Sequence, residues 1–345
     1  MGEFPYSGAA HCNTTKGCLP GTRVGILTQI EQWVYQTGED VPRLFVLYGS
    51  EGTGKSTIAN SVAKRYDEVG RLASSFAFLR GDATRHSHFM FPTISRDLAD
   101  RDAAFRQALD EIVGTETRLR QSYIISEQFQ NLLLKPMNKL ALVGPLVIVI
   151  DALNQCDTEN LRSIAEVLST NARSLPTNIR ILITCCPDKP LPDLLKDGVY
   201  IKTKSIENDE GSTCDDIRTF IRFELKDYDG LTDRIVDAIV NAAGQRFRFA
   251  STVCDALLNN VNGIAIDDLL DQLLTRSSSH LSGFDEAARA KSAPTLPPAP
   301  TPPHGLTPPP TPPTSSNSIH NFTFSNTGTG SMYNRNIGNI VTKSM

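Results

Sequence analysis

Eight residues near position 50 have the spacing Gly-x-x-x-x-Gly-Lys-Ser, which binds phosphate when a strand precedes it and a helix follows. An apolar run at 44–48 comes directly before the motif, and a helical pattern at 55–66 follows it. Glycines allow the backbone to approach an anion closely, and N–H groups at a helix N-terminus favour negative charge. The residues expected to contact phosphate groups are Gly49, Ser50, Glu51, Gly52, Thr53, Gly54, Lys55, Ser56 and Thr57.

A second motif follows about a hundred residues later, where an apolar run at 146–150 ends in an acid, Asp151. In proteins with a phosphate loop, this arrangement holds a magnesium ion opposite the loop's hydroxyl. We therefore expect Ser56 and Asp151 to be Mg²⁺ ligands and Lys55 to reach the β- and γ-phosphates. The predicted ligand is ATP or GTP, and the motif does not choose between them because its contacts are to phosphates.

Strand and helix patterns alternate along the first two hundred residues. This alternation predicts an α/β fold of the P-loop NTPase type, with a parallel sheet covered by helices on both faces. The strand candidates are 44–48, 75–79, 146–150, 179–184 and 199–202, and the helical patterns are 26–33, 55–66, 103–113, 127–134 and 160–169.

Strand signals end near residue 206, and only helical patterns separated by glycines follow. Between Pro294 and Pro313 the chain contains eleven of its 21 prolines, which favours an extended spacer. The predicted divisions are an N-terminal segment (1–40), the NTPase core (41–205), a small α-helical subdomain (206–285), a Pro-rich linker (286–314) and a tail rich in Asn, Gly and Ser (315–345).

Charge and cysteine content exclude several classes of protein. The net charge is −4, from 34 basic and 38 acidic residues, so nothing favours a nucleic-acid or anionic-membrane partner. No apolar run approaches the ~20 residues of a membrane span. Seven irregularly spaced cysteines do not suggest a disulfide framework, and we expect a reducing, cytoplasmic compartment.

Several stretches together resemble the NACHT class of STAND NTPases, in the form common in mushroom-type fungi. The resemblance covers roughly residues 12 to 275. It rests on the segment Cys18-Leu19-Pro20-Gly21-Thr22-Arg23 before a helix containing Trp33, the loop 49–57, the strand Ser75 to Arg80, the segment Asp151 to Cys156, and the segment Ile181 to Pro187.

This resemblance implies an NLR-like signalling switch, in which nucleotide binding and exchange convert a closed monomer into an oligomer that triggers a self-recognition or immune response. The implied partners are a nucleoside triphosphate and either further copies of the chain or a signalling protein, contacted through the helical subdomain or the tail. The sensor repeats usual in the family are not found, so the chain looks truncated beside its relatives.

Three positions depart from the family pattern. Asn154 and Gln155 stand where two catalytic acids are usual, and Cys186 stands where the sensor strand usually has an arginine. An amide cannot accept a proton from the attacking water as a carboxylate can, and losing a general base typically costs ~10²–10⁴ in rate. The expectation is nucleotide binding with impaired hydrolysis. The alternatives are an active P-loop ATPase or GTPase and a non-enzymatic adaptor or decoy with a structural nucleotide site.

The remaining candidates are less specific. Arg80 ends the second strand at the ligand side of the sheet and is either a phosphate contact or a surface arginine. His86 and His88 are expected to be solvated in a polar loop. In the tail, Phe322 and Phe324 alternate with polar residues, so 315–345 is interpreted either as an amyloid-type signalling motif or as a disordered low-complexity segment.

Overall fold

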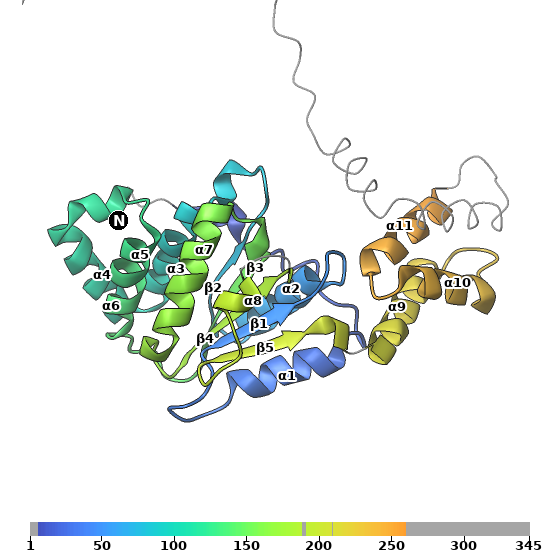
Figure 1. Ribbon diagram of the computed structural model, residues 1–345, viewed down its shortest axis with the longest axis horizontal. Coiled ribbons are helices and arrows are strands. Elements are labelled where there is room, and N and C mark those ends of the chain that lie inside the picture. Colours follow the sequence, from blue (N-terminus) through green and yellow to red (C-terminus); the bar gives the residue numbers. More distant parts are fainter. Residues whose placement is uncertain (1–5, 188–190, 209, 260–345) are drawn as a thin grey trace, which may run out of the picture. The chain divides into compact units, whose positions relative to one another are not determined.

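A computed structural model describes residues 6–187, 191–208 and 210–259, and within them five parallel strands form one sheet (Figure 1). Their order is β2-β3-β4-β1-β5, so β4 separates the strand before the phosphate loop from the strand that ends in the acid. Parallel strands bring their carboxyl ends to one edge, where the loops that carry function gather. The strands are β1 (Leu44–Tyr48), β2 (Leu72–Ala77), β3 (Leu146–Asp151), β4 (Ile179–Cys185) and β5 (Ile201–Ser205).

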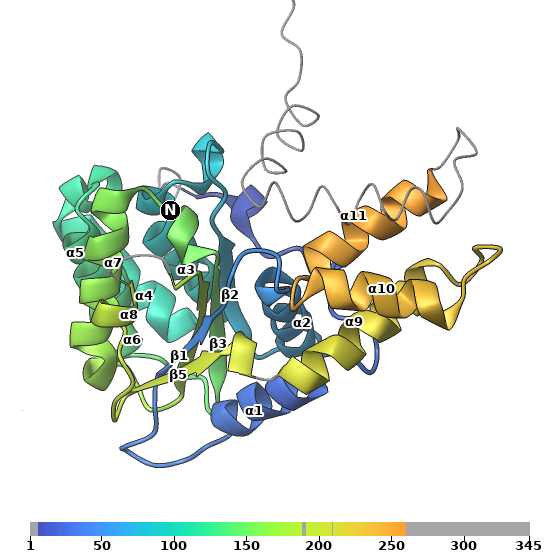
Figure 2. The same ribbon diagram turned by 45° about the vertical axis from the view of Figure 1, so that its right-hand side comes forward.

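Helices cover both faces of this sheet, as Figure 2 shows. One face buries Phe45, Leu47 and Val149 under α1 (Val24–Val34) and α2 (Lys55–Glu68). Alternate residues such as Leu44 and Val46 point to the opposite face, because successive side chains of a strand alternate. The second face packs against α3 (Ser87–Arg101), α4 (Ala103–Thr115), α5 (Ile125–Gln128), α6 (Lys135–Met137), α7 (Thr158–Asn171) and α8 (Leu191–Leu194).

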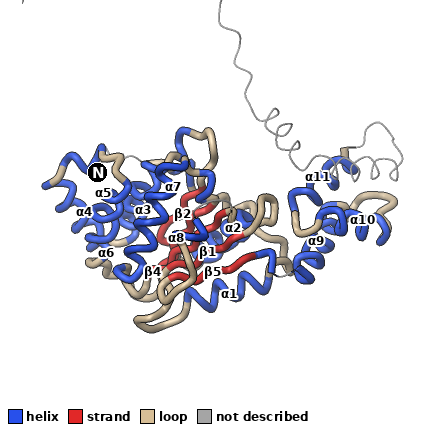
Figure 3. The backbone as a smooth tube through the Cα atoms, in the orientation of Figure 1, coloured by secondary structure: helices blue, strands red, loops and turns tan. Residues whose placement is uncertain are grey.

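After β5 the described chain contains only helices and loops (Figure 3). The helices α9 (Glu210–Glu224), α10 (Asp233–Ala243) and α11 (Phe247–Leu258) enclose their own core, which includes Ile217, Ile239 and Val253. These helices belong to the same compact unit as the sheet, which spans Met1–Asp285. We refer to α9–α11 as the helical subdomain.

The predicted fold class is confirmed, with a parallel sheet covered on both faces and helices after it. The strand predicted at 75–79 spans Leu72–Ala77, so it begins and ends earlier, and the one predicted at 199–202 spans Ile201–Ser205, so it begins and ends later. The predicted subdomain after residue 259, the Pro-rich linker (286–314) and the tail (315–345) lie outside the described residues. None of the helices in the described part of the chain is long and apolar enough to cross a membrane.

The helix α3 was not predicted, because Pro92 and several polar residues obscure its pattern. Pro92 has no N–H for the carbonyl of His88, and the buried Gln128 supplies a donor in its place, with its Nε2 3.0 Å from that oxygen. The sequence prediction that His86 and His88 both lie solvated in a polar loop was wrong for His88. This residue lies in the first turn of α3, half-buried against Phe89 and Tyr123, whereas His86 is exposed before the helix.

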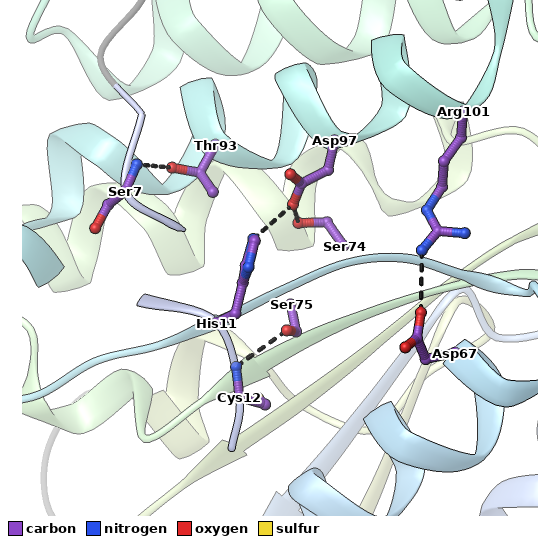
Figure 4. Close-up of polar contacts among 9 residues, drawn as sticks. All are labelled: Ser7, His11, Cys12, Asp67, Ser74, Ser75, Thr93, Asp97 and Arg101. Atoms are coloured by element: carbon purple, nitrogen blue, oxygen red, sulfur yellow. Dashed lines mark hydrogen bonds and ion pairs between the residues drawn. The ribbon is translucent and has the colours of Figure 1, made fainter. Parts of the chain in front are cut away.

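The N-terminal segment crosses the edge strand β2 and binds to α3 (Figure 4). The backbone N–H of Cys12 donates to Ser75 Oγ at 3.1 Å. His11 Nε2 lies 3.0 Å from Asp97 Oδ2, the same oxygen that accepts from Ser74 Oγ at 2.5 Å. The segment therefore lies across an edge strand, and covering an edge with a loop is one way in which proteins prevent unwanted strand pairing.

The His11–Asp97 contact predicts pH-dependent stability. The hydrogen bond that His11 makes to the carboxylate of Asp97 raises the pKa of His11 above its ordinary value. A raised folded-state pKa stabilises the fold fully below the unfolded value of about 6.5, and this contribution is lost as the pH rises through the folded value. His11→Ala should therefore lower the thermal midpoint most near pH 6 and least near pH 8. Equal losses at both pH values, or an equal pH trend in the control His86→Ala, would contradict this.

Candidate functional site

The predicted phosphate loop joins β1 to α2 and is closely packed. Gly52 and Gly54 have φ angles of 82° and 93°, in the left-handed region that favours glycine. A Cβ at Gly52 would lie 2.9 Å from the Cβ of Arg248, and a Cβ at Gly49 would collide with Ile206. Glycine is therefore required at Gly52 both by the backbone conformation and by the close approach of the helical subdomain.

Lys55 lies in the first turn of α2 and is buried, with 8% of its surface exposed. Its ammonium donates to the carbonyl oxygens of Gly49 and Ser50, at 2.7 Å in each case. An ammonium has three donors, and these bonds use two of them. The third can serve a phosphate oxygen while the loop holds the other two.

Asp151 is a carboxylate at the end of β3 with only 5% of its surface exposed. Its Oδ1 accepts from Thr184 Oγ1 at 2.5 Å, and the hydroxyl of Ser56 lies close enough to the carboxyl group to lower its pKa. Burial raises the pKa of Asp151, while these two hydroxyls and the charge of Lys55 act in the opposite direction. A buried carboxylate beside a hydroxyl is an oxygen donor set that suits Mg²⁺, so the residues present fit the ion that the sequence predicts.

Thr184 also fixes the backbone after Asp151. Its Oγ1 accepts from the N–H of Ala152 at 2.9 Å, and Ala152 has a φ of 56°, which is unusual for a residue other than glycine. A strained residue of this kind persists only when its surroundings hold it. The hydroxyl of Thr184 thus orients both the carboxylate and the turn that follows it.

The three positions that depart from the family pattern lie near this edge. Asn154 Oδ1 accepts from the N–H of Cys186 at 3.0 Å, which links the turn after β3 to the end of β4. Gln155 is half-buried in the same turn, and Cys186 is buried. The side-chain oxygen of Asn154 therefore has a structural role, and a carboxylate oxygen at this position could accept the same hydrogen bond.

Two residues near the loop were not predicted as site residues. Glu207, just after β5, accepts from the N–H of Ser50 at 2.7 Å and also from its hydroxyl, and these bonds lower the pKa of Glu207. Arg23 reaches the loop from before α1, with its Nη2 2.8 Å from the carbonyl oxygen of Thr53. Neither has a local sequence signal, since both contacts join residues far apart in the chain. Arg80 is exposed after β2, and its proposed phosphate contact stays a prediction.

The contacts of Thr184 predict the effect of removing its hydroxyl. Thr184→Val leaves the Ala152 N–H without its acceptor and Asp151 with one donor fewer, so the free energy of unfolding should fall by about 1–3 kcal/mol. Thr184→Ser keeps the hydroxyl and should lose only about 0.8 kcal/mol for one carbon. Chemical denaturation of the nucleotide-free variants measures both, and a valine variant as stable as the serine variant would contradict the assignment.

Comparison with known proteins gives one family match. Residues 21–186 match the family described as Nephrocystin 3, N-terminal. No curated protein matches the chain.

Several solved structures are similar to the chain at low identity. C. elegans PCH-2 has 15% identity and a TM-score of 0.41, over 76% of this chain and 70% of that chain. Domain III of the replication initiation protein DnaA from Thermotoga maritima has 13% identity and a TM-score of 0.42, over 76% of this chain and 95% of that chain. AMPPCP-bound DnaA from Aquifex aeolicus has 15% identity and a TM-score of 0.37, over 73% of this chain and 66% of that chain. The family match places similarity to the Nephrocystin 3 N-terminal family in residues 21–186, and the described chain has an α/β fold with a five-stranded parallel sheet.

Proposed function

We propose that this protein is a nucleotide-binding switch of the NACHT/STAND type that takes ATP or GTP together with Mg²⁺. The observation that carries the proposal is the meeting of Lys55, Ser56 and Asp151 at the carboxyl edge of the sheet, beside a glycine loop. The lysine neutralises phosphate charge, and the two oxygen ligands complete a magnesium site together with phosphate oxygens and water.

Contacts between the phosphate loop and the helical subdomain support a switch rather than a simple binding site. The N–H of Arg248 donates to Gly52 O at 3.1 Å, and its guanidinium pairs with Glu51 at 2.8 Å. A ligand that favours one arrangement of these elements shifts their equilibrium by its difference in affinity for the two states. The helical subdomain or the tail would pass this change to another copy of the chain or to a signalling partner.

We further propose that hydrolysis is impaired. Gln155 has no carboxylate to accept a proton from water, and Asn154 already bonds to the backbone of Cys186. A switch needs little turnover, so binding groups can be retained while cleaving groups are lost. The alternative, an ordinary ATPase or GTPase, requires another base to replace them.

Lys55→Ala tests the binding site. It removes a charge-assisted hydrogen bond to phosphate, so the dissociation constant of Mg²⁺–ATP or Mg²⁺–GTP should rise roughly 10–100-fold. The matched control is Lys64→Ala, which removes an exposed lysine from the same helix and should leave affinity unchanged. Titration with a fluorescent triphosphate measures both, and unchanged affinity in the Lys55 variant would refute the assignment.

Restoring the acids one at a time tests the hydrolysis proposal. Gln155→Glu should raise the rate, by up to ~10²-fold if the new carboxylate acts as a general base. Asn154→Asp keeps an oxygen for the Cys186 N–H and should change the rate less. Phosphate release under single-turnover conditions measures each rate. A wild-type chain that turns over at ~1 s⁻¹ or faster would show an ordinary enzyme instead.

A further inference from the structure

Arg23 is a buried arginine in a strained backbone position. Only 5% of its surface is exposed, and its φ of 56° is rare for a side chain of this size. Such a conformation persists when surrounding contacts over-determine it, and strained residues of this kind cluster at functional sites. Its contacts therefore indicate what the residue does.

The contacts of Arg23 join three parts of the chain. Its Nη2 donates to Thr53 O in the phosphate loop at 2.8 Å. Its Nη1 donates to Thr213 Oγ1 at 2.8 Å, and its backbone N–H donates to Asp216 Oδ2 at 3.0 Å, both on α9. The guanidinium also lies 4.9 Å from the ring centre of Phe247 on α11. Arg23 thus connects the N-terminal segment, to which it belongs, with the phosphate loop and the helical subdomain.

The bond to Thr53 O has a consequence for the loop because a peptide unit is planar and trans. The carbonyl of Thr53 and the N–H of Gly54 belong to one peptide unit and point in opposite directions. When Arg23 holds the carbonyl outward, the N–H of Gly54 is turned to the other side. The N–H of Arg248 holds Gly52 O in the same way, which turns the N–H of Thr53.

Consecutive N–H groups pointing to one side form an anion-binding nest. The orientation of two of them is set from outside the loop, by Arg23 and by the backbone of α11. A nest ordered before the anion arrives binds more tightly, because the cost of ordering is not subtracted from affinity.

We propose that Arg23 is a positioning residue of the nucleotide site: held by α9 and α11, it fixes the Thr53–Gly54 peptide unit so that the Gly54 N–H faces the phosphates. By holding Arg23, the helical subdomain contributes to nucleotide affinity, although Arg23 itself does not contact the nucleotide. This inference rests on the proposed function.

The test compares Arg23→Lys with Arg180→Lys in the chain of 345 residues. Arg180 is a matched control because it is also buried, at 2% exposure, and donates to the carbonyls of Trp33, Gln36 and Thr177, away from the loop. A lysine keeps the charge in both variants but lacks the fork that serves several acceptors at once. A gentler variant, Thr213→Val, removes only one acceptor of Arg23.

Calorimetric titration with Mg²⁺–ATP and Mg²⁺–GTP gives the first measurement. Arg23→Lys should bind roughly ten-fold more weakly, and Thr213→Val should shift affinity in the same direction by less. Arg180→Lys should lower the thermal midpoint but keep affinity within about two-fold. Wild-type affinity in Arg23→Lys, or an equal loss in Arg180→Lys, would overturn the inference.

Amide hydrogen exchange without nucleotide gives the second measurement and separates this inference from the proposed function. Arg23→Lys should speed exchange in peptides covering 49–57 and α9 together, whereas Arg180→Lys should not. Unchanged exchange in the loop would overturn the positioning role. A wild-type chain that binds no nucleotide would refute the proposed function, and the exchange result would still decide whether Arg23 orders the loop.

Discussion

The site depends on keeping one carboxylate, Asp151, out of water at the end of an apolar strand. Burial disfavours a charged carboxylate, so the group requires compensating donors. Thr184 from β4, Ser56 from α2 and the charge of Lys55 provide them. These partners come from elements far apart in sequence, and the strand order brings them together, because β4 lies between β1 and β3. The electrostatics of the site therefore depend on the sheet topology.

The elements that the sequence predicts correctly are those whose signal lies in neighbouring residues of the chain. The bounds of β1 were predicted correctly because a continuous apolar run ends at a glycine turn. The start of β2 was missed because Ser74 is a polar residue inside a buried strand, and its hydroxyl bonds to Asp97. The helix α3 was missed because Pro92 normally ends a helix, and only a distant donor, Gln128, satisfies the carbonyl that it leaves unpaired.

The same distinction applies to the candidate site. The loop residues follow a spacing that has a direct physical reason, and the strand ending in Asp151 follows from a strong apolar pattern. Arg23, Thr184 and Glu207 act through contacts across 30 to 157 residues of sequence, which no local pattern reports. The family resemblance predicts that Asn154 replaces a catalytic acid, and this stays a prediction. The structure adds that the side chain of Asn154 links the turn after β3 to the end of β4.

The central claim is that Lys55, Ser56 and Asp151 form a magnesium-dependent triphosphate site. Isothermal titration calorimetry of the wild-type chain with ATP and GTP, each with Mg²⁺ and with a chelator, tests it most directly, and AMP is the control that lacks the β- and γ-phosphates. The account predicts one-to-one binding of at least one triphosphate, weaker without Mg²⁺, and much weaker binding of AMP. Equal affinity for AMP and the triphosphates, or no binding of any nucleotide, would contradict it.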